Sequence, residues 1–169
     1  MDAPEARAPR LPPPWFKHAF WRAHRAAYRL SGGRFLWTPA SSKRGWGALH
    51  LTTVGRKSGQ ERSVILGYLE DGSDLVTLAM NGWDEGDPAW WLNLQAHPEA
   101  LVRVSGQQPR PVRARAAQGA ERARLWQLWV AIDPQQDAYA ALRSNETPVV
   151  VLEPHEVADE HEGPSNPTS

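Results

Sequence analysis

Three cationic side chains crowd one short stretch of the chain: Arg56, Lys57 and Arg62. Cations that spread from a single turn repel one another unless an anion or a carboxylate lies among them. Arginine offers a rigid fork of donors to phosphate or carboxylate, whereas lysine offers a mobile point charge. Ser58 adds a hydroxyl group, and Glu61 answers only part of the positive charge. The pattern therefore indicates an anion-binding turn, and the alternative is an ordinary solvated hairpin tip.

The residues on either side of these cations predict a β-hairpin that presents them. In the stretch 49–66, LHLTTVGRKSGQERSVIL, the first arm alternates apolar and polar residues and the second is rich in β-branched ones. Gly55 and Gly59 permit the positive φ angles of a tight reversal between the arms. The turn is not a P-loop, because the GxxxxGK[ST] spacing is missing.

Further alternating and periodic segments predict the elements that surround this hairpin. We expect strands at residues 49–53, 63–69, 75–79, 101–104, 112–116 and 149–152. We expect helices at residues 88–97, 119–132 and 135–143, the first of them capped by Asp87 before Pro88. Arg103, Arg113 and Arg115 should face water. Because the strands arrive as hairpins and the helices come late, the sequence predicts an α+β fold built on an antiparallel barrel or sheet.

The length of 169 residues and the biased composition of both ends predict one folded domain with extensions. Residues 1–14 are rich in proline and predict a disordered leader, and residues 155–169 predict an acidic disordered tail. Residues 15–46 predict a basic amphipathic helix at 15–30 and a loop, ahead of the main domain at 47–154. That helix either covers one end of the core or lies on an anionic membrane surface.

Several classes of function are excluded or disfavoured. The formal net charge is zero, which argues against non-specific nucleic-acid binding. The chain has no cysteine, no apolar run of the roughly 20 residues that a bilayer requires, and no signal peptide, so we expect a cytoplasmic protein with, at most, peripheral membrane contact through residues 15–30. The histidines are scattered and predict no metal site.

No acid, base or nucleophile stands out among the remaining residues. Ser58 lacks an elbow motif, and the carboxylates Asp84, Glu85 and Asp87 are typical of solvated capping groups. What remains is a cationic turn, a glycine-bearing loop and a set of aromatic residues. Such a site can bind and orient a reactive cofactor without supplying the reactive atom itself.

Three segments in this order and spacing, TVGRKSGQERSVIL, LAMNGWDEGDPAWWLNLQAHP and TPVVVLEP, resemble the deazaflavin (F420)-dependent nitroreductases, also called F420H2-dependent quinone reductases. The resemblance covers residues 49–154. It implies a split β-barrel related to FMN-binding oxidases, with reduced coenzyme F420 in a groove along the barrel. It also implies that Arg56 and Lys57 meet the oligoglutamate tail and that Arg62 meets the phosphate. The other cofactor contacts that it implies are Ser58, Ser63, Val64, Ile65, Leu66, Ala79, Met80, Asn81, Gly82, Trp90, Trp91 and Asn93.

The implied activity is hydride transfer from the reduced deazaflavin to a quinone, a nitroaromatic compound or another small electrophile. Such a reaction needs positioning and water exclusion more than acid–base chemistry, and the acceptor's proton comes from Tyr139 or from water. The chain departs from well-known members at residues 80–83 and has Asp133 and Gln136 where some members carry tyrosines. These departures disfavour nitroimidazole activation, whereas quinone reduction is a looser expectation.

Two alternatives stay open at this point, and so does the oligomeric state. The same barrel can hold FMN or haem, although FMN has one phosphate and no polyglutamate, and so leaves Arg56 and Lys57 less well explained. The chain can also be a non-catalytic module that binds anions or a membrane surface.

Overall fold

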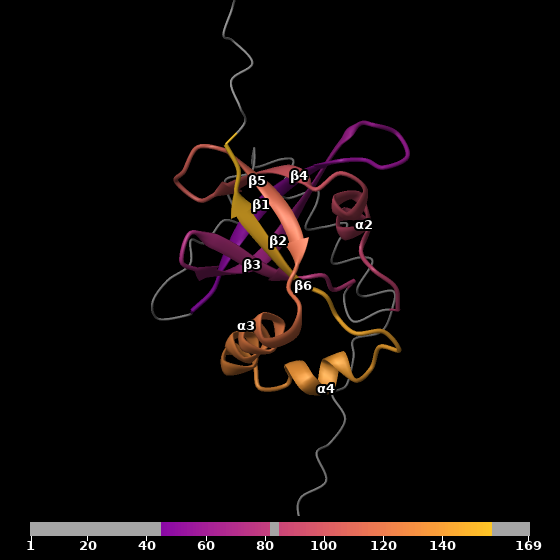
Figure 1. Cartoon of the computed structure of the whole chain (residues 1–169), viewed down its shortest axis with the longest axis vertical. Coiled ribbons are helices and arrows are strands. Elements are labelled where there is room, and N and C mark those ends of the chain that lie inside the picture. Colours follow the sequence, from indigo (N-terminus) through magenta and orange to yellow (C-terminus); the bar gives the residue numbers. More distant parts are fainter. Residues whose placement is uncertain (1–44, 82–84, 157–169) are drawn as a thin grey trace, which may run out of the picture.

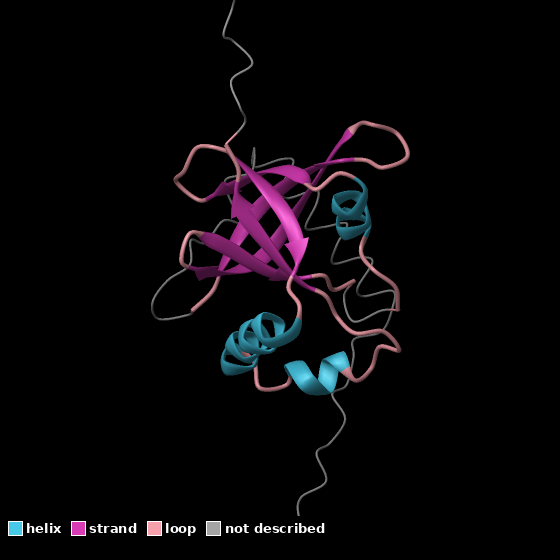
Figure 2. Cartoon of the chain, in the orientation of Figure 1, coloured by secondary structure: helices cyan, strands magenta, loops and turns pink. Residues whose placement is uncertain are grey.

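A computed structural model describes the chain over residues 45–81 and 85–156. The predicted leader 1–14, the predicted helix 15–30, Gly82 and most of the predicted acidic tail lie outside the described residues. Within the described part, antiparallel strands close a barrel, with one short helix beside it and two helices at one end (Figures 1 and 2). The predicted α+β fold with an antiparallel barrel is confirmed.

Every neighbouring pair of strands in the barrel is antiparallel. The strands are β1 (Gly47–Val54), β2 (Glu61–Asp71), β3 (Asp74–Leu78), β4 (Glu99–Val104), β5 (Arg110–Ala116) and β6 (Val149–Pro154). Their order around the barrel is β1-β2-β3-β6-β5-β4, and β4 pairs with β1 to close the ring. β1 and β2 form the predicted hairpin, with Thr53 opposite Arg62 and Leu49 opposite Leu66.

The helices are α2 (Ala89–Ala96), α3 (Gly119–Ile132) and α4 (Gln136–Ala140). α3 has the predicted bounds, whereas α4 is shorter than the predicted 135–143. The prediction that Asp87 caps α2 is wrong, because the N-cap residue is Pro88 and no side chain caps the helix. The Asp87 carboxylate instead accepts a hydrogen bond from Arg143. None of the helices in the described part combines the length and the apolarity needed to cross a bilayer.

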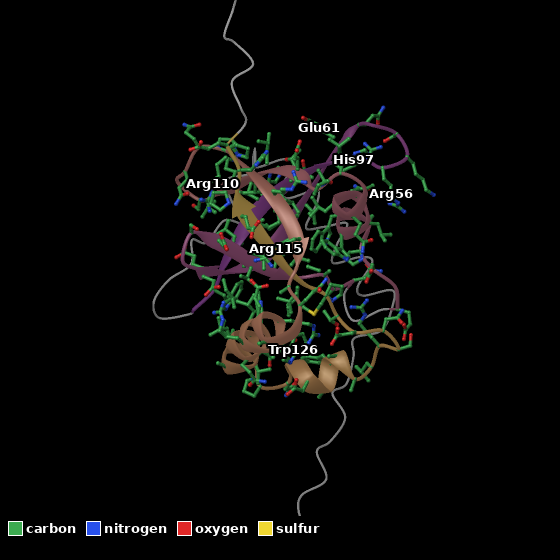
Figure 3. The ribbon with its side chains drawn as sticks, in the orientation of Figure 1. Arg56, Glu61, His97, Arg110, Arg115 and Trp126 are labelled. Carbon is green, nitrogen blue, oxygen red and sulfur yellow. The ribbon has the colours of Figure 1, made fainter. Side chains whose placement is uncertain are left out.

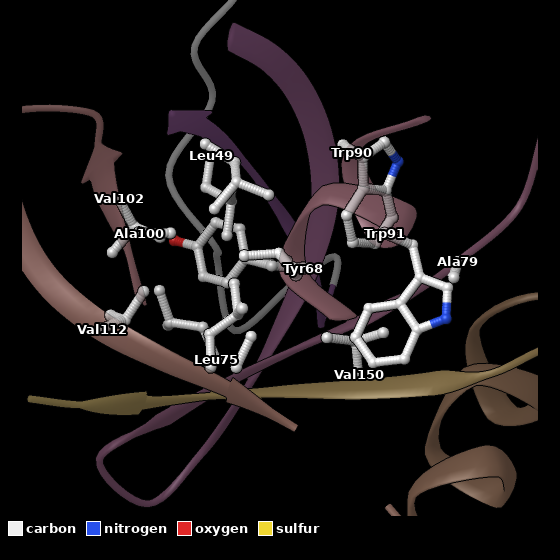
Figure 4. Packing of buried hydrophobic residues seen from close by; sticks show 14 of the residues in the cluster. Leu49, Tyr68, Leu75, Ala79, Trp90, Trp91, Ala100, Val102, Val112 and Val150 are labelled. Atoms are coloured by element: carbon white, nitrogen blue, oxygen red, sulfur yellow. The ribbon is translucent and has the colours of Figure 1, made fainter. Parts of the chain in front are cut away.

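The barrel interior is one hydrophobic cluster, which α2 helps to cover. Tyr68 of β2 is fully buried, and the α2 residues Trp90, Trp91 and Leu94 join the same cluster (Figure 4). The two indole rings meet edge to face at 62°, with their centroids 6.4 Å apart. Packing of this kind, in which large apolar groups leave water together, supplies most of the free energy that holds such a barrel.

A second hydrophobic cluster lies outside the barrel, between α3 and the strands β3 and β6. Leu125, Trp126 and Trp129 of α3 pack there against Val149 and Val151. The next residues of β6, Val150 and Leu152, point into the barrel. Both faces of β6 are therefore buried, which explains why its sequence is an unbroken apolar run.

The arginines of β4 and β5 that were expected to face water do so only in part. Arg113 is exposed and lies 3.6 Å from Glu99. Arg115 instead forms a fork to Glu121 of α3 and a further contact to Glu153 of β6, each at 2.7 Å. These carboxylates raise the pKa of Arg115 above its usual range. Arg103 lies half-buried on the outer face, opposite His50 in the β1–β4 register.

Candidate functional site

The cationic turn between β1 and β2 is closed by its own backbone hydrogen bonds. Gly55 donates to the carbonyl of Gln60 at 2.8 Å and accepts from Gly59 at 2.7 Å. Of the two glycines of this turn, only Gly59 has a positive φ, 65°. Gly55 is required for a different reason: a Cβ there would lie 2.9 Å from the Ser58 hydroxyl oxygen and 3.0 Å from the Gln60 carbonyl. The prediction of positive φ at both glycines is therefore half right, and the turn is rigid for two separate reasons.

The three cations of the turn form no ion pair with any residue in the described part of the chain. Arg56 and Lys57 are exposed, and Arg56 lies at the side of the barrel away from Arg110 (Figure 3). Arg62, also exposed, donates to the Gln60 side chain at 3.1 Å and to the Glu61 carbonyl at 3.4 Å. The Ser58 hydroxyl accepts from the Gln60 amide at 3.3 Å. No carboxylate in the described part of the chain therefore neutralises the charges of the turn.

Asn93 of α2 holds this turn in place. Its side-chain oxygen accepts from the Arg56 backbone N–H at 3.1 Å and from Arg56 Nη1 at 3.4 Å. Its amide nitrogen donates to the Thr53 hydroxyl at 3.2 Å, and that hydroxyl donates to the Arg62 carbonyl at 3.3 Å. Asn93 is buried, and both lone-pair directions of its oxygen are already used. The structure therefore gives Asn93 the role of fixing the turn. The sequence does not point to its partner Thr53.

Most of one edge of β2 is left unpaired by the described strands. β3 pairs only with residues 69–71 of β2, and the Thr77 hydroxyl donates to the Gly67 carbonyl at 2.8 Å. Because backbone groups alternate sides along a strand, Ser63 and Ile65 direct their N–H and C=O groups to the same open side as Gly67. Their side chains point out of the barrel, whereas Val64 and Leu66 pack against the interior cluster. Of the four residues predicted to line the ring, Ser63 and Ile65 thus offer backbone groups at the open edge, and Val64 and Leu66 offer apolar side chains.

The loop after β3 begins with residues whose backbone groups are already used. Ala79 is buried, its N–H donates to Pro148 at 2.9 Å, and the Met80 N–H donates to Leu78 at 2.9 Å. These two residues therefore have no backbone N–H to offer a phosphate, although the resemblance implies amides from this loop. Asn81 is exposed.

Arg143 is a residue of this region that the sequence does not reveal. Its side chain has no exposure to solvent, and it donates to the Ala79 carbonyl, to Thr147, to the Gly86 carbonyl and to Asp87. These partners lie far from Arg143 in sequence, apart from Thr147, so no local pattern could have indicated them.

Trp90 and Trp91, predicted to close the cofactor side, are both buried in the interior cluster. The indole nitrogen of Trp91 is also buried, on the side next to Ala79, and it has no hydrogen-bond partner (Figure 4). A buried indole N–H normally finds an acceptor. This unpartnered donor lies in α2, the helix that also holds the cationic turn through Asn93.

Tyr139, the predicted proton donor, lies on α4 and is half-buried. Its hydroxyl donates to the Gln135 side chain at 2.8 Å. Gln136 beside it is buried, and its side-chain oxygen is unpartnered. α4 lies beside α3, at the end of the barrel away from the cationic turn in the view of Figure 1. The structure does not bring Tyr139 together with Arg56.

The segment before α2 is also tied down by Glu85, which gives a pH-dependent prediction. The side chain and the backbone N–H of Ser144 both donate to the Glu85 carboxylate, at 2.8 and 2.9 Å. These bonds hold the pKa of Glu85 below its ordinary value of 4.5, and the bond from the Ser144 side chain has the larger effect. A carboxyl whose pKa is depressed by folding stabilises the protein above its ordinary pKa and loses that contribution as the pH falls through the folded value.

We therefore expect the unfolding free energies of the natural protein and Glu85→Gln to differ at pH 7 and to converge below pH 4.5. Urea unfolding across this range measures the difference. Ser144→Ala removes the donor hydroxyl and should show the same convergence. A difference that persists unchanged at the lowest pH would show that the Glu85 charge is not involved.

Comparison with known proteins gives the family of the chain. A model of the family described as F420H(2)-dependent quinone reductase matches residues 20–154. The F420H(2)-dependent quinone reductase of Mycobacterium tuberculosis is 34% identical over 139 residues, which cover 78% of this chain and 87% of the relative.

Solved structures show the same barrel. An F420-H2 dependent reductase, FDR-A, is 32% identical with a TM-score of 0.56, over 63% of this chain and 93% of that one. A chain described as a domain-swapped dimer is 26% identical with a TM-score of 0.57, over 80% of this chain and 99% of that one. HutZ, a haem storage protein of Vibrio cholerae, is 11% identical with a TM-score of 0.52, over 68% of this chain and 84% of that one. At this low identity the match shows the fold alone.

The split barrel and the family expected from the three sequence segments are both confirmed. The family model spans the cationic turn, α2 and β6, which are the elements that carry those segments. The chain therefore belongs to the F420H2-dependent quinone reductase family of oxidoreductases.

Proposed function

We propose that this chain binds reduced F420 and catalyses hydride transfer to a quinone or a similar small electrophile. The observation that carries the proposal is the cationic turn: three exposed cations without a described carboxylate partner, on a turn that Asn93 fixes at Arg56 beside the open part of the β2 edge. Family membership supports the choice of cofactor.

The turn suits the anionic half of such a cofactor. Arg56 and Lys57 would bind the carboxylates of its tail, and Arg62 would bind its phosphate, because Arg forks match both groups. Asn93 holds the backbone of Arg56, so that this cation does not have to be ordered when the ligand arrives. Preorganisation of this kind raises affinity by lowering the entropy lost on binding.

The open edge of β2 suits the ring half. The N–H groups of Ser63 and Ile65 would donate to the polar edge of the ring, and Val64 and Leu66 would provide apolar contact beside it. Backbone donors that are fixed before the reaction stabilise developing negative charge without reorganisation.

When bound, reduced F420 supplies a hydride, and the quinone takes this hydride and one proton to become a hydroquinone. The chain's own residues would bind both partners, exclude water from the ring face and hold the reacting atoms at short distance. Water is the simplest source of the proton, since Tyr139 lies on α4 and donates to Gln135. A cysteine-free chain is compatible with a reducing cytoplasm, which we propose as the compartment.

Titration of the purified chain with F420 and with FMN tests the cofactor, and oxidation of reduced F420 in the presence of quinones, nitroaromatics and enones tests the reaction. We expect saturable F420 binding, much weaker FMN binding, and turnover that is fastest with quinones. Tight FMN binding without F420 binding would overturn the cofactor assignment. F420 binding without turnover of any acceptor would indicate a carrier rather than an enzyme.

A further inference from the structure

Arg143 is the most completely buried charged side chain in the described part of the chain, with no exposure of its side chain to solvent. Nη1 donates to the Ala79 carbonyl at 3.2 Å and to the Thr147 hydroxyl at 3.0 Å. Nη2 donates to the Gly86 carbonyl at 3.0 Å and to Asp87 at 3.2 Å. A buried guanidinium is costly unless it is paired and hydrogen-bonded, and these acceptors serve both Nη atoms, whereas the buried Nε has no partner among the described residues.

The acceptors of Arg143 belong to segments that frame the candidate site. Ala79 follows β3 directly, and Gly86 and Asp87 come just before Pro88, which begins α2. Arg143 therefore ties the end of β3 and the start of α2 to the C-terminal segment 143–147. Glu85 adds a second tie between the same segments through Ser144.

α2 is also tied to the cationic turn. α2 has eight residues, so it is about 12 Å long at 1.5 Å per residue. Arg143 fixes the chain just before its first turn, and Asn93 in its second half fixes Arg56 and Thr53. α2 thus has one polar attachment just before its first turn and another at Asn93, near its middle.

We propose that Arg143 is a positioning residue for the cationic turn. Arg143 fixes the position of the start of α2, and α2 fixes the position of Arg56 through Asn93. Stability alone does not account for this arginine, because apolar replacement of a buried ion pair is often neutral or stabilising. A fork directed at acceptors on separate segments instead fixes where those segments lie. The consequence for cofactor binding rests on the proposed function, whereas the structural step does not.

Hydrogen exchange of the full chain without cofactor tests the structural step. In Arg143→Met we expect the amides of Leu92 and His97 in α2, and that of Arg56, to exchange at least about tenfold faster. Amides of β5 and β6 should be unaffected. Unchanged exchange in α2, or equal acceleration throughout the barrel, would overturn the proposal, since the second result describes a general stabiliser.

Arg122→Met is the matched control. Arg122 donates to the Thr147 carbonyl at 3.2 Å and lies 3.0 Å from Glu146, so it contacts the same C-terminal segment from α3. The structure gives it no hydrogen bond or ion pair with α2 or with Ala79. We expect α2 exchange in this variant to match the natural protein, and acceleration there as large as in Arg143→Met would count against a specific role of Arg143.

A second arm measures F420 affinity by fluorescence titration, well below the unfolding temperature of each variant. We expect the Kd to rise at least about tenfold in Arg143→Met, the size expected when a charged hydrogen bond is lost, and less in Arg143→Lys. An unchanged Kd with a loosened α2 would overturn the link to the cofactor. If the natural protein binds no F420, the proposed function fails, and the exchange result still decides the positioning role.

Asp87→Asn provides a variant for the case in which Arg143→Met does not fold. It keeps an oxygen acceptor for Nη2 but removes the charge of the pair. We expect amide exchange to accelerate less than in Arg143→Met, and only in α2 and at Arg56. No acceleration in this variant would oppose the proposal.

Discussion

Replacing both Arg56 and Lys57 by alanine is expected to weaken F420 binding by about two orders of magnitude and to change folding stability little. A hydrogen bond to a charged group contributes about 1.5–3 kcal/mol, and two lost contacts therefore amount to about 3 kcal/mol or more. A tenfold change in affinity corresponds to about 1.4 kcal/mol. Because neither side chain has an ion-pair partner in the described part of the chain, the folded protein loses little without them.

Fluorescence titration at low and high salt measures this loss, and thermal unfolding without cofactor measures stability. The matched control is the double variant Arg110→Ala and Arg113→Ala, which removes the same charge from β5, away from the turn (Figure 3). We expect the F420 affinity of this control to stay within about twofold of that of the natural protein. Affinity should fall steeply with salt in both of these proteins, and less steeply in the Arg56 and Lys57 variant, which has lost two of the cations. A large fall in the unfolding temperature of the Arg56 and Lys57 variant would instead show that the cations are structural.

Asn93→Ala is expected to reduce both F420 affinity and stability, the latter by about 2–3 kcal/mol. The substitution leaves the backbone N–H of Arg56 without its acceptor and removes the donor to Thr53, and buried polar groups without partners are costly. Urea unfolding and F420 titration measure the two effects.

Asn93→Asp separates geometry from charge. The new carboxylate can still accept from Arg56, so the turn should keep its place, but the negative charge competes with an anionic ligand. We expect affinity to fall at least about tenfold with the Arg56 amide still protected from exchange. Thr53→Val, which removes only the hydroxyl partner, should have the smaller effect on affinity. Normal binding by Asn93→Ala would mean that the turn does not need Asn93.

The fold could be predicted well where local sequence decides it. α3 has the predicted bounds because its apolar period and the Asp133–Pro134 break are both local signals. The predictions of the end of α4 and of the cap of α2 were wrong for a different reason. Asp87 is a good capping residue by type, but Arg143, 56 residues away in sequence, takes its carboxylate.

The candidate site divides in the same way. The sequence identified the cationic turn because its charges are adjacent in the chain. Asn93 was placed near the cofactor by resemblance, yet its contacts with Thr53 and Arg56 lie 40 and 37 residues away and are visible only in the fold. Arg143 carried no signal at all, since a lone arginine at the end of a short helix is ordinary on a surface. Which side each residue of β2 faces also required the strand register.

β6 has a consequence for the order in which the site can form during synthesis. It is the last described strand in the chain, and it fills the gap between β3 and β5. The hairpin that carries the cationic turn needs only residues 47–71, so it can pair early. Until residues 149–154 emerge from the ribosome, β3 and β5 both present unpaired edges, which are the features that favour aggregation. The nascent chain can thus form its cationic turn well before it has a closed barrel to support it.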